Sequence, residues 1–130
     1  MKKLLLVLLC LPIIGFGQTA DDYFNKALDY AQNGKSQLAI DNFTECLKIM
    51  PDYAYAYYNR GLAYHKLENY KDAIADFSGA LKINPDYALA YYNRGLANKK
   101  AGFPYCSDYE KACDLGIKES CKSYSEQCSK

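Results

Sequence analysis

Cysteines are the residues of this sequence whose type and spacing are best suited to chemistry. Four of them are grouped near the C-terminus, at spacings of 7, 8 and 7 residues. Clustered cysteines form disulfides or bind a metal, but zinc sites usually use closely spaced C-x-x-C pairs, which this cluster lacks. We therefore expect disulfides and no metal site. The four residues are Cys106, Cys113, Cys121 and Cys128.

The pairing follows from the helices that must carry these cysteines. A spacing of seven residues is two helical turns to within about 20°, so each spaced pair shares one face of a helix. Folding the two helices back on each other at Gly116 pairs the cysteines symmetrically, Cys113 with Cys121 and Cys106 with Cys128. Either other pairing would span about 10 Å along the helix axis, beyond the ~7 Å between Cα atoms that a disulfide permits.

These helices end a chain that repeats itself every 34 residues. The stretch "PDYAYAYYNRGLAYHK" at 51–66 returns at 85–100 as "PDYALAYYNRGLANKK", and residues 20–53 align without gaps to residues 54–87. Apolar and small residues recur at helical spacing, and breaks fall at "NGKS", at "LENY" and at the prolines between units. Each unit is therefore predicted to form two amphipathic helices. Pro104 is expected in the first turn of a further helix that ends at Gly116.

The unit resembles the tetratricopeptide repeat, whose pattern places an aromatic residue, Gly, Tyr, Ala, Phe and Pro at fixed offsets. The matching residues of the second unit are Tyr57, Gly61, Tyr64, Ala73, Phe77 and Pro85. The resemblance implies an all-α, right-handed α-solenoid of about three helix pairs, because one pair cannot bury its apolar face alone. The expected repeats are 20–53, 54–87 and 88–116, followed by a capping helix at 117–128. Residues 111–121, "KACDLGIKESC", also resemble exported bacterial repeat proteins that are stapled by cysteines.

The first seventeen residues have the order of a secretory signal peptide: a basic start, the apolar run "LLLVLLCLPII", and small residues before Gln18. The run is too short to span a bilayer of ~30 Å. We expect cleavage after Gly17, which leaves a domain at 18–130. A lipid anchor at Cys10 is the alternative, but Leu9 stands where a small residue is normal. Export to an oxidising compartment, the periplasm or the outside of a Gram-negative bacterium, agrees with the expected disulfides.

Little in the chain suggests catalysis. Its one histidine, His65, lies in a repeat helix, and the sequence has no Gly-rich phosphate loop and no haem motif. A formal charge of +1 excludes a strongly basic nucleic-acid binder. Cys46 takes the place of a core alanine, so we expect it to be buried and reduced. We therefore expect no enzyme, no catalytic residue and no cofactor, with His65 exposed on the groove side.

The family resemblance implies that the first helix of each unit lines a concave groove. Asn25, Asn59 and Asn93 lie one period apart on these helices, and their amides would form a ladder that pairs with an extended peptide backbone. The alternative is that asparagine persists there as consensus. The carboxylate clamp of chaperone-binding members is incomplete in this chain. The other residues expected at the groove are Tyr55, Tyr58, Tyr92, Leu62, Leu96, His65, Lys66, Lys99 and Lys100.

Two arginines before the helix glycines recur with an acid in the following helix. Arg60 is matched by Asp76 and Arg94 by Asp108, so we expect ion pairs within the repeats rather than ligand contacts.

We therefore expect a protein–protein interaction module that binds an extended segment or C-terminal tail of another protein, with its oligomeric state left open. Two alternatives remain. One is a cell-wall protein that binds or hydrolyses peptidoglycan or a β-lactam, as some cysteine-rich bacterial repeat proteins are linked to penicillin or peptidoglycan binding. The other is a scaffold that assembles its own oligomer.

Overall fold

A computed structural model describes residues 17–130, so the expected signal peptide (apart from Gly17) and Cys10 lie outside the described residues. Over residues 17–130 the chain forms α-helices and connecting turns without a strand. The helices are α1 (Ala20–Gln32), α2 (Ser36–Ile49), α3 (Ala54–Lys66), α4 (Tyr70–Ile83), α5 (Ala88–Ala101), α6 (Cys106–Asp114) and α7 (Lys118–Gln127).

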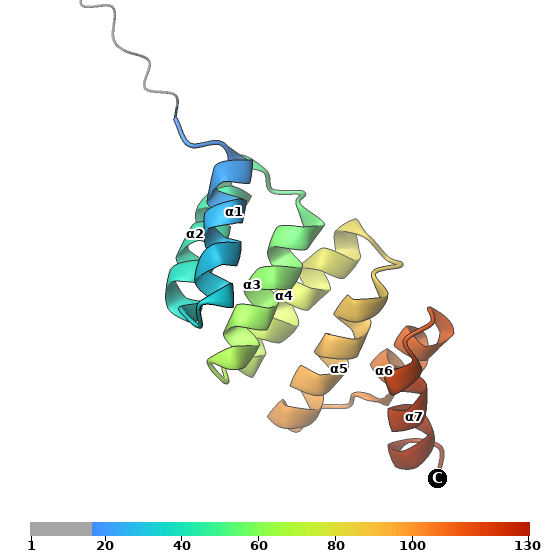
Figure 1. The fold of residues 1–130 in the computed structure, drawn as a ribbon. Coiled ribbons are helices and arrows are strands. Elements are labelled where there is room, and N and C mark those ends of the chain that lie inside the picture. Colours follow the sequence, from blue (N-terminus) through green and yellow to red (C-terminus); the bar gives the residue numbers. More distant parts are fainter. Residues whose placement is uncertain (1–16) are drawn as a thin grey trace, which may run out of the picture.

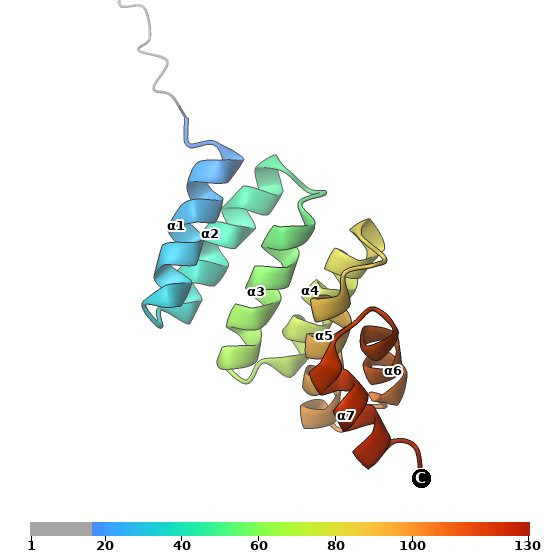
Figure 2. The same cartoon turned by 45° about the vertical axis from the view of Figure 1, so that its right-hand side comes forward.

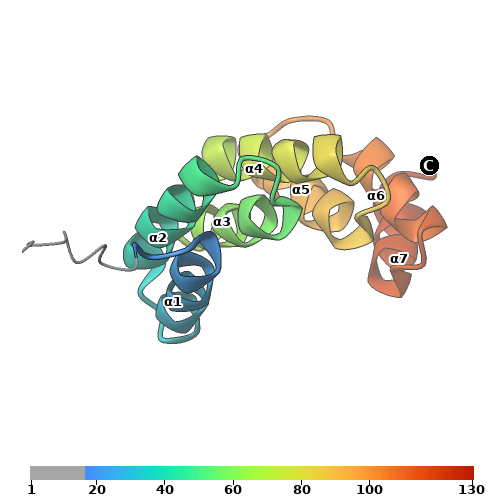
Figure 3. The same ribbon diagram turned by 90° about the horizontal axis from the view of Figure 1, so that it is seen from above.

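The helices form a stack of pairs in chain order. α1 packs with α2, α3 with α4 and α5 with α6, and each pair also contacts the next (Figure 1). α7 packs on α6 and closes the C-terminal end of the stack (Figure 2). Seen from above, the stack is bowed, with α2 and α4 on the outer side and α3 on the inner side (Figure 3). The expected fold class, three helix pairs and a capping helix, is confirmed.

Local sequence signals set most helix ends. Thr19 and Asp22 form a capping box at the start of α1, in which each side chain accepts a hydrogen bond from the other's backbone amide. Asn69 caps α4 by accepting from the amide of Asp72. Gly102 and Gly116 take left-handed φ angles of 80° and 100° after α5 and α6, a conformation that favours glycine.

The start of α6 differs from the prediction. The helix begins at Cys106, so Pro104 lies outside it rather than in its first turn. Tyr105 has φ −131° and ψ −12°, which is not helical, and its ring packs at 5.3 Å from the ring of buried Tyr109. Tyr105 is therefore the N-cap of α6, its carbonyl oxygen accepts the first helical hydrogen bond from the amide of Tyr109, and Pro104 precedes the cap.

The core is built from small residues of one helix set against large rings of its partner. Gly61 lies against the ring of Phe77, and Gly95 lies against the ring of Tyr109. Both rings are almost fully buried. A second contact repeats with the period of the sequence, since the rings of Phe24 and Tyr53 lie 4.8 Å apart, as do those of Tyr58 and Tyr87. Repeated residues thus make repeated contacts, as a stacked repeat requires.

Two partly buried ion pairs each join the two helices of one pair, the first within the second pair and the other within the third. Arg60 of α3 bonds Asp76 of α4, and Arg94 of α5 bonds Asp108 of α6. Both arginines also donate to a hydroxyl of the preceding pair, Arg60 to Thr44 and Arg94 to Ser78. The predicted pairing is confirmed, and each arginine also links neighbouring repeats.

Two disulfides join α6 to α7. Cys106 pairs with Cys128 at a Cα separation of 5.7 Å, and Cys113 pairs with Cys121 at 4.6 Å. These are the pairs that the spacing predicts, and bonded sulfurs leave no thiolate in this cluster for a metal. Cys46 is free and buried. Among the helices of residues 17–130, none has the length and apolar character to cross a membrane.

Candidate functional site

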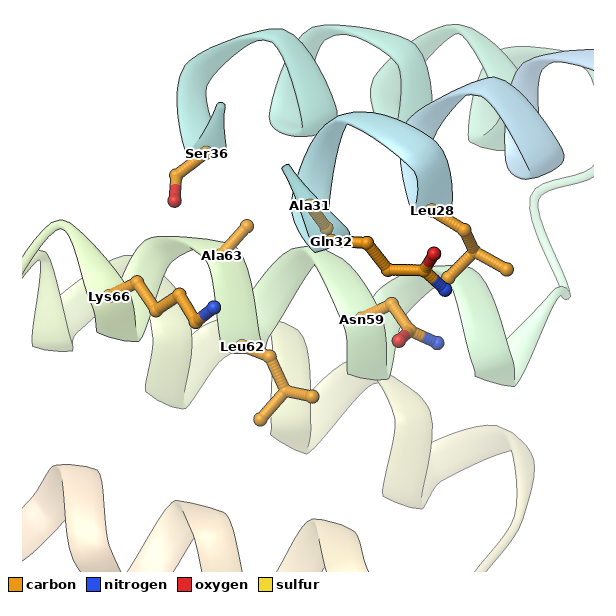
Figure 4. A pocket seen from close by; sticks show the side chains of 8 residues that line it. All are labelled: Leu28, Ala31, Gln32, Ser36, Asn59, Leu62, Ala63 and Lys66. Carbon is orange, nitrogen blue, oxygen red and sulfur yellow. The ribbon is translucent and has the colours of Figure 1, made fainter. Parts of the chain in front are cut away.

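A cavity of about 270 Å³ opens where α1 and the start of α2 meet α3 (Figure 4). Four aliphatic side chains form its apolar part, and four polar side chains surround them. Three residues expected at the groove, Asn59, Leu62 and Lys66, are brought together here. The lining residues are Leu28, Ala31, Gln32, Ser36, Asn59, Leu62, Ala63 and Lys66.

Two small residues account for the cavity. Ala31 and Ser36 stand where the next repeat, 34 residues later, has His65 and Tyr70. In that second repeat the two rings lie edge to face, 5.1 Å apart. In the second repeat, the larger side chains fill the equivalent place. In the first repeat, Ala31 and Ser36 leave this place open.

The polar lining offers both hydrogen-bond donors and acceptors. The hydroxyl of Ser36 points down toward α3, and Lys66 extends back along α3 toward the cavity (Figure 4). Asn59 uses Nδ2 to donate to the carbonyl oxygen of Tyr55 at 2.7 Å, so its Oδ1 remains available as an acceptor. Gln32 places a second amide beside the cavity.

The three asparagines expected to form a ladder have different surroundings. Asn59 and Asn93 each donate to the carbonyl oxygen four residues earlier, in Tyr55 and Leu89. Asn93 also donates to the hydroxyl of Tyr58 at 3.2 Å, whereas Asn25 is exposed. Asn93 thus uses two amide bonds within the protein and Asn59 uses one, and Oδ1 of each accepts no hydrogen bond from the described residues.

The tyrosines expected at the groove divide into packed and exposed residues. Tyr58 packs against Phe77 and Tyr87, and Tyr92 packs 5.9 Å from Tyr109, so both belong to the contacts between helices. Burial raises the pKa of Tyr58 above its usual value. Tyr55 is 60 % exposed and is the tyrosine of this set that presents most surface to solvent.

The basic residues are not equivalent either. Lys66 lines the cavity, whereas Lys99 donates to Oε1 of Gln127 at 2.7 Å and so binds the capping helix. Lys100 is exposed. His65 is half-buried against Tyr70 rather than exposed as expected, because the turn between α3 and α4 places that ring over it. Burial lowers the pKa of His65, and the positive charge of Lys100 lowers it further.

Sequence reasoning missed the α1 and α2 side of the cavity. Gln32, Ser36 and Leu28 were not among the expected groove residues, although they line it with Asn59. A position-by-position comparison of the first two repeats would have found the signal, because the first repeat is smaller at positions 31 and 36.

Comparison with known protein families supports the repeat assignment. Residues 54–87 match the family described as "Tetratricopeptide repeat", and residues 27–68 match "TPR repeat". Among the curated proteins, none has a sequence that matches this chain significantly.

Solved structures of tetratricopeptide domains share the fold. The first TPR of Spaghetti (RPAP3), bound to the HSP90 peptide SRMEEVD, is 27% identical, with 84% of this chain and 92% of that chain covered at a TM-score of 0.77. The first TPR domain of human RPAP3 is also 27% identical, covering 83% and 88% at a TM-score of 0.76. The TPR2B domain of yeast Sti1 is 23% identical, covers 82% and 94% at a TM-score of 0.75, and so shows the fold alone. Together with the stacked helix pairs, these matches show that residues 27–87 contain tetratricopeptide repeats and that the chain shares the fold of solved tetratricopeptide domains.

Proposed function

We propose that this protein is a non-enzymatic interaction module that binds an extended segment of another protein along α1, α3 and α5. The observation that carries the proposal is the open cavity lined by polar and aliphatic side chains of α1, α3 and the start of α2. Its volume of about 270 Å³ is below the ~300–1,000 Å³ typical of pockets for drug-sized ligands. It therefore suits one or two side chains of a longer chain that continues along the helices.

Groups on the same face suit an extended backbone. The free Oδ1 atoms of Asn59 and Asn93 can accept from peptide amides, and one period of the repeat separates them. Tyr55 and Leu89 add exposed apolar surface one turn earlier on the same helices. The RPAP3 domain of similar structure is bound to a peptide, which supports the same use of the fold here.

We further propose that the protein works in an oxidising compartment after removal of residues 1–17. Two disulfides in one short helix pair support this location, because such bonds are rare where thiols are kept reduced. The bacterial envelope or the secreted space is the compartment that the proposed signal peptide implies.

The test is a selection of random peptides displayed on phage against the chain that begins at Gln18. Recovered peptides are then measured by fluorescence anisotropy with wild type and with Asn59→Ala/Asn93→Ala. We expect the double variant to lose about tenfold or more in affinity, because two hydrogen bonds to the peptide backbone are lost.

Asn42→Ala is the matched control. Asn42 makes the same local contact, donating to the carbonyl oxygen of Leu38 at 2.8 Å, but it lies on α2. It should retain wild-type affinity. Unchanged affinity of the double variant would place binding elsewhere on the molecule, and failure to enrich any peptide would contradict the proposed function.

A further inference from the structure

The cavity between α1 and α3 lies at the N-terminus of α2, which no side chain caps. Lys35 precedes α2 and makes no side-chain capping bond within the described residues. In the next repeat the same place holds Asn69, which caps α4 through the amide of Asp72. The first-turn amides of a helix lack partners inside the helix and carry partial positive charge. The start of α2 therefore adds positive potential beside the cavity.

Ser36 is a second feature, besides the uncapped start of α2, that favours a ligand in this cavity. This residue is only 8 % exposed, lines the cavity, and forms no side-chain hydrogen bond with any part of residues 17–130. Because this hydroxyl opens onto the cavity and has no partner among the described residues, it is free to bond to a ligand or to water. Its hydroxyl points toward α3, on the side where Lys66 lies (Figure 4).

Lys66 is the one charged residue among the eight that line the cavity, so the charge of the lining is positive. Lys66 is exposed and forms no ion pair with the rest of the described chain, whose ion pairs use Lys48, Arg60 and Arg94. None of the eight lining residues is acidic. An ammonium group, a free hydroxyl and an uncapped helix start thus surround one small space, and each favours a negative charge.

We propose that this cavity binds the side-chain carboxylate of an aspartate or glutamate in the bound segment, an inference that rests on the proposed function. Lys66 and Ser36 hold the carboxylate, and Oδ1 of Asn59 accepts from the peptide backbone beside it. The apolar part, formed by Leu28, Ala31, Leu62 and Ala63, takes the methylene groups of that residue and of an apolar neighbour. A free inorganic anion would leave this apolar part unfilled, so a side chain of a peptide is the better occupant.

The probes are short synthetic peptides of Ser, Thr and Leu, acetylated and amidated at their ends. One has a central Glu and its partner has Gln at that position. A third peptide has Gln in the centre and a free C-terminal carboxylate. Each is titrated up to millimolar concentration into the ¹⁵N-labelled chain that begins at Gln18, and affinity is read from the amide shifts of α1, α3 and the start of α2.

Two variants test the cavity in different ways. Lys66→Met removes the ammonium group, and Lys100→Met is its matched control, because Lys100 has the same place in the next repeat but does not line the cavity. Ala31→His/Ser36→Tyr fills the cavity with the pair of side chains that the second repeat already accommodates. Helicity and the melting temperature verify that each variant folds.

We expect wild type and Lys100→Met to bind the Glu peptide about tenfold more tightly than the Gln peptide, as for a hydrogen bond to a charged group. Lys66→Met should bind both peptides equally, and the filled variant should give no shifts at α2. Equal binding of the Glu and Gln peptides by wild type would overturn the carboxylate site and leave peptide binding intact.

Two other results would also overturn the inference. If the amidated Gln peptide fails while the Gln peptide with a free C-terminus binds as well as the Glu peptide, the ligand is a terminal carboxylate. If no probe shifts any of these amides, the carboxylate site is wrong. The phage selection then decides separately whether the protein binds peptides at all.

Discussion

Arg60 and Asp76 face each other across α3 and α4, and the guanidinium donates to both carboxylate oxygens, from Nε at 2.7 Å and from Nη2 at 2.8 Å. Their side chains are 18 % and 7 % exposed. Arg60 also donates to Thr44 of α2 at 3.0 Å. The pair therefore connects three helices and two repeats.

Asp76→Asn should destabilise the protein strongly. Removing one partner of a buried pair typically costs about 3–5 kcal/mol, because the remaining charge is left without compensation. We expect the lower end, about 3 kcal/mol, since Arg60 keeps some contact with water. Urea unfolding followed by circular dichroism measures the loss.

Glu45→Gln is the control for Asp76→Asn. It breaks the exposed Lys48–Glu45 pair, which lies within one helix, and should cost less than about 1 kcal/mol. Equal losses in the two variants would show that the buried pair does not stabilise the stack.

Gly95→Ala should destabilise the protein although alanine is the better helix former. A Cβ at this position would lie 2.7 Å from the ring of Tyr109, which is 1 % exposed and has no space to move. Overpacking costs about 1–3 kcal/mol, against a gain of about 1 kcal/mol in helix propensity.

Gly79→Ala tests the same substitution at a position where the neighbouring ring, that of Tyr57, has space to move. Its Cβ would lie 3.1 Å from the ring of Tyr57, which is only half-buried. Thermal unfolding should show a lower melting temperature for Gly95→Ala than for Gly79→Ala. The reverse order would contradict the tight contact at Tyr109.

The outer disulfide should contribute more stability than the inner one. Cys106→Ala/Cys128→Ala opens a loop with a sequence separation of 22, and Cys113→Ala/Cys121→Ala opens one of 8. In the chain-entropy model these losses are roughly 3 and about 2.5 kcal/mol. Unfolding in urea without reductant compares the two variants, and no loss in either would mean that α7 is held by packing alone.

Cys46 should react with iodoacetamide only after unfolding. The side chain is fully buried, and burial raises the pKa of its thiol, with a further contribution from the negative charge of Asp21. Mass spectrometry of the chain that begins at Gln18 should show no label under native conditions and one label in denaturant. Cys46→Ala, the control, should take up none.

Stability should fall between neutral and mildly acidic pH, in part because of His65. Its folded-state pKa lies below the unfolded value of about 6.5, so the unfolded chain binds the proton more readily. This contribution is present above the unfolded pKa and is lost as the pH falls through the folded pKa. His65→Phe keeps a ring against Tyr70 but cannot titrate, and its urea midpoint should change less with pH over this range. Parallel pH profiles for wild type and variant would contradict the assignment.

Much of the architecture could be predicted from the residues alone. The period of 34, the small residues such as Gly61 and the breaks at Pro51 and Pro85 define the helix pairs, because helical periodicity is a property of the local sequence. The cysteine spacings define the disulfide pairs for a similar reason, since spacing along a helix determines which side chains meet across a turn. The predicted partners of Arg60 and Arg94 follow from the same repetition.

What the groove residues do was decided by tertiary structure. Tyr58 and Tyr92 became parts of the packing between helices, Lys99 bonded the capping helix, and His65 lay half-buried under Tyr70. A sequence pattern assigns a residue to a face of its helix, but the neighbours across that face decide whether its polar atoms remain free.

The cavity shows most clearly how what the sequence predicts differs from what the tertiary packing decides. The sequence by itself determined that Ser36 and Ala31 are smaller than Tyr70 and His65 one period later. Only the packing of α1 and α2 against α3 determined that this missing volume stays open, beside Lys66 and an uncapped helix start. The volume left between side chains depends on all the surfaces that enclose it, and those come from three helices that no local sequence pattern brings together.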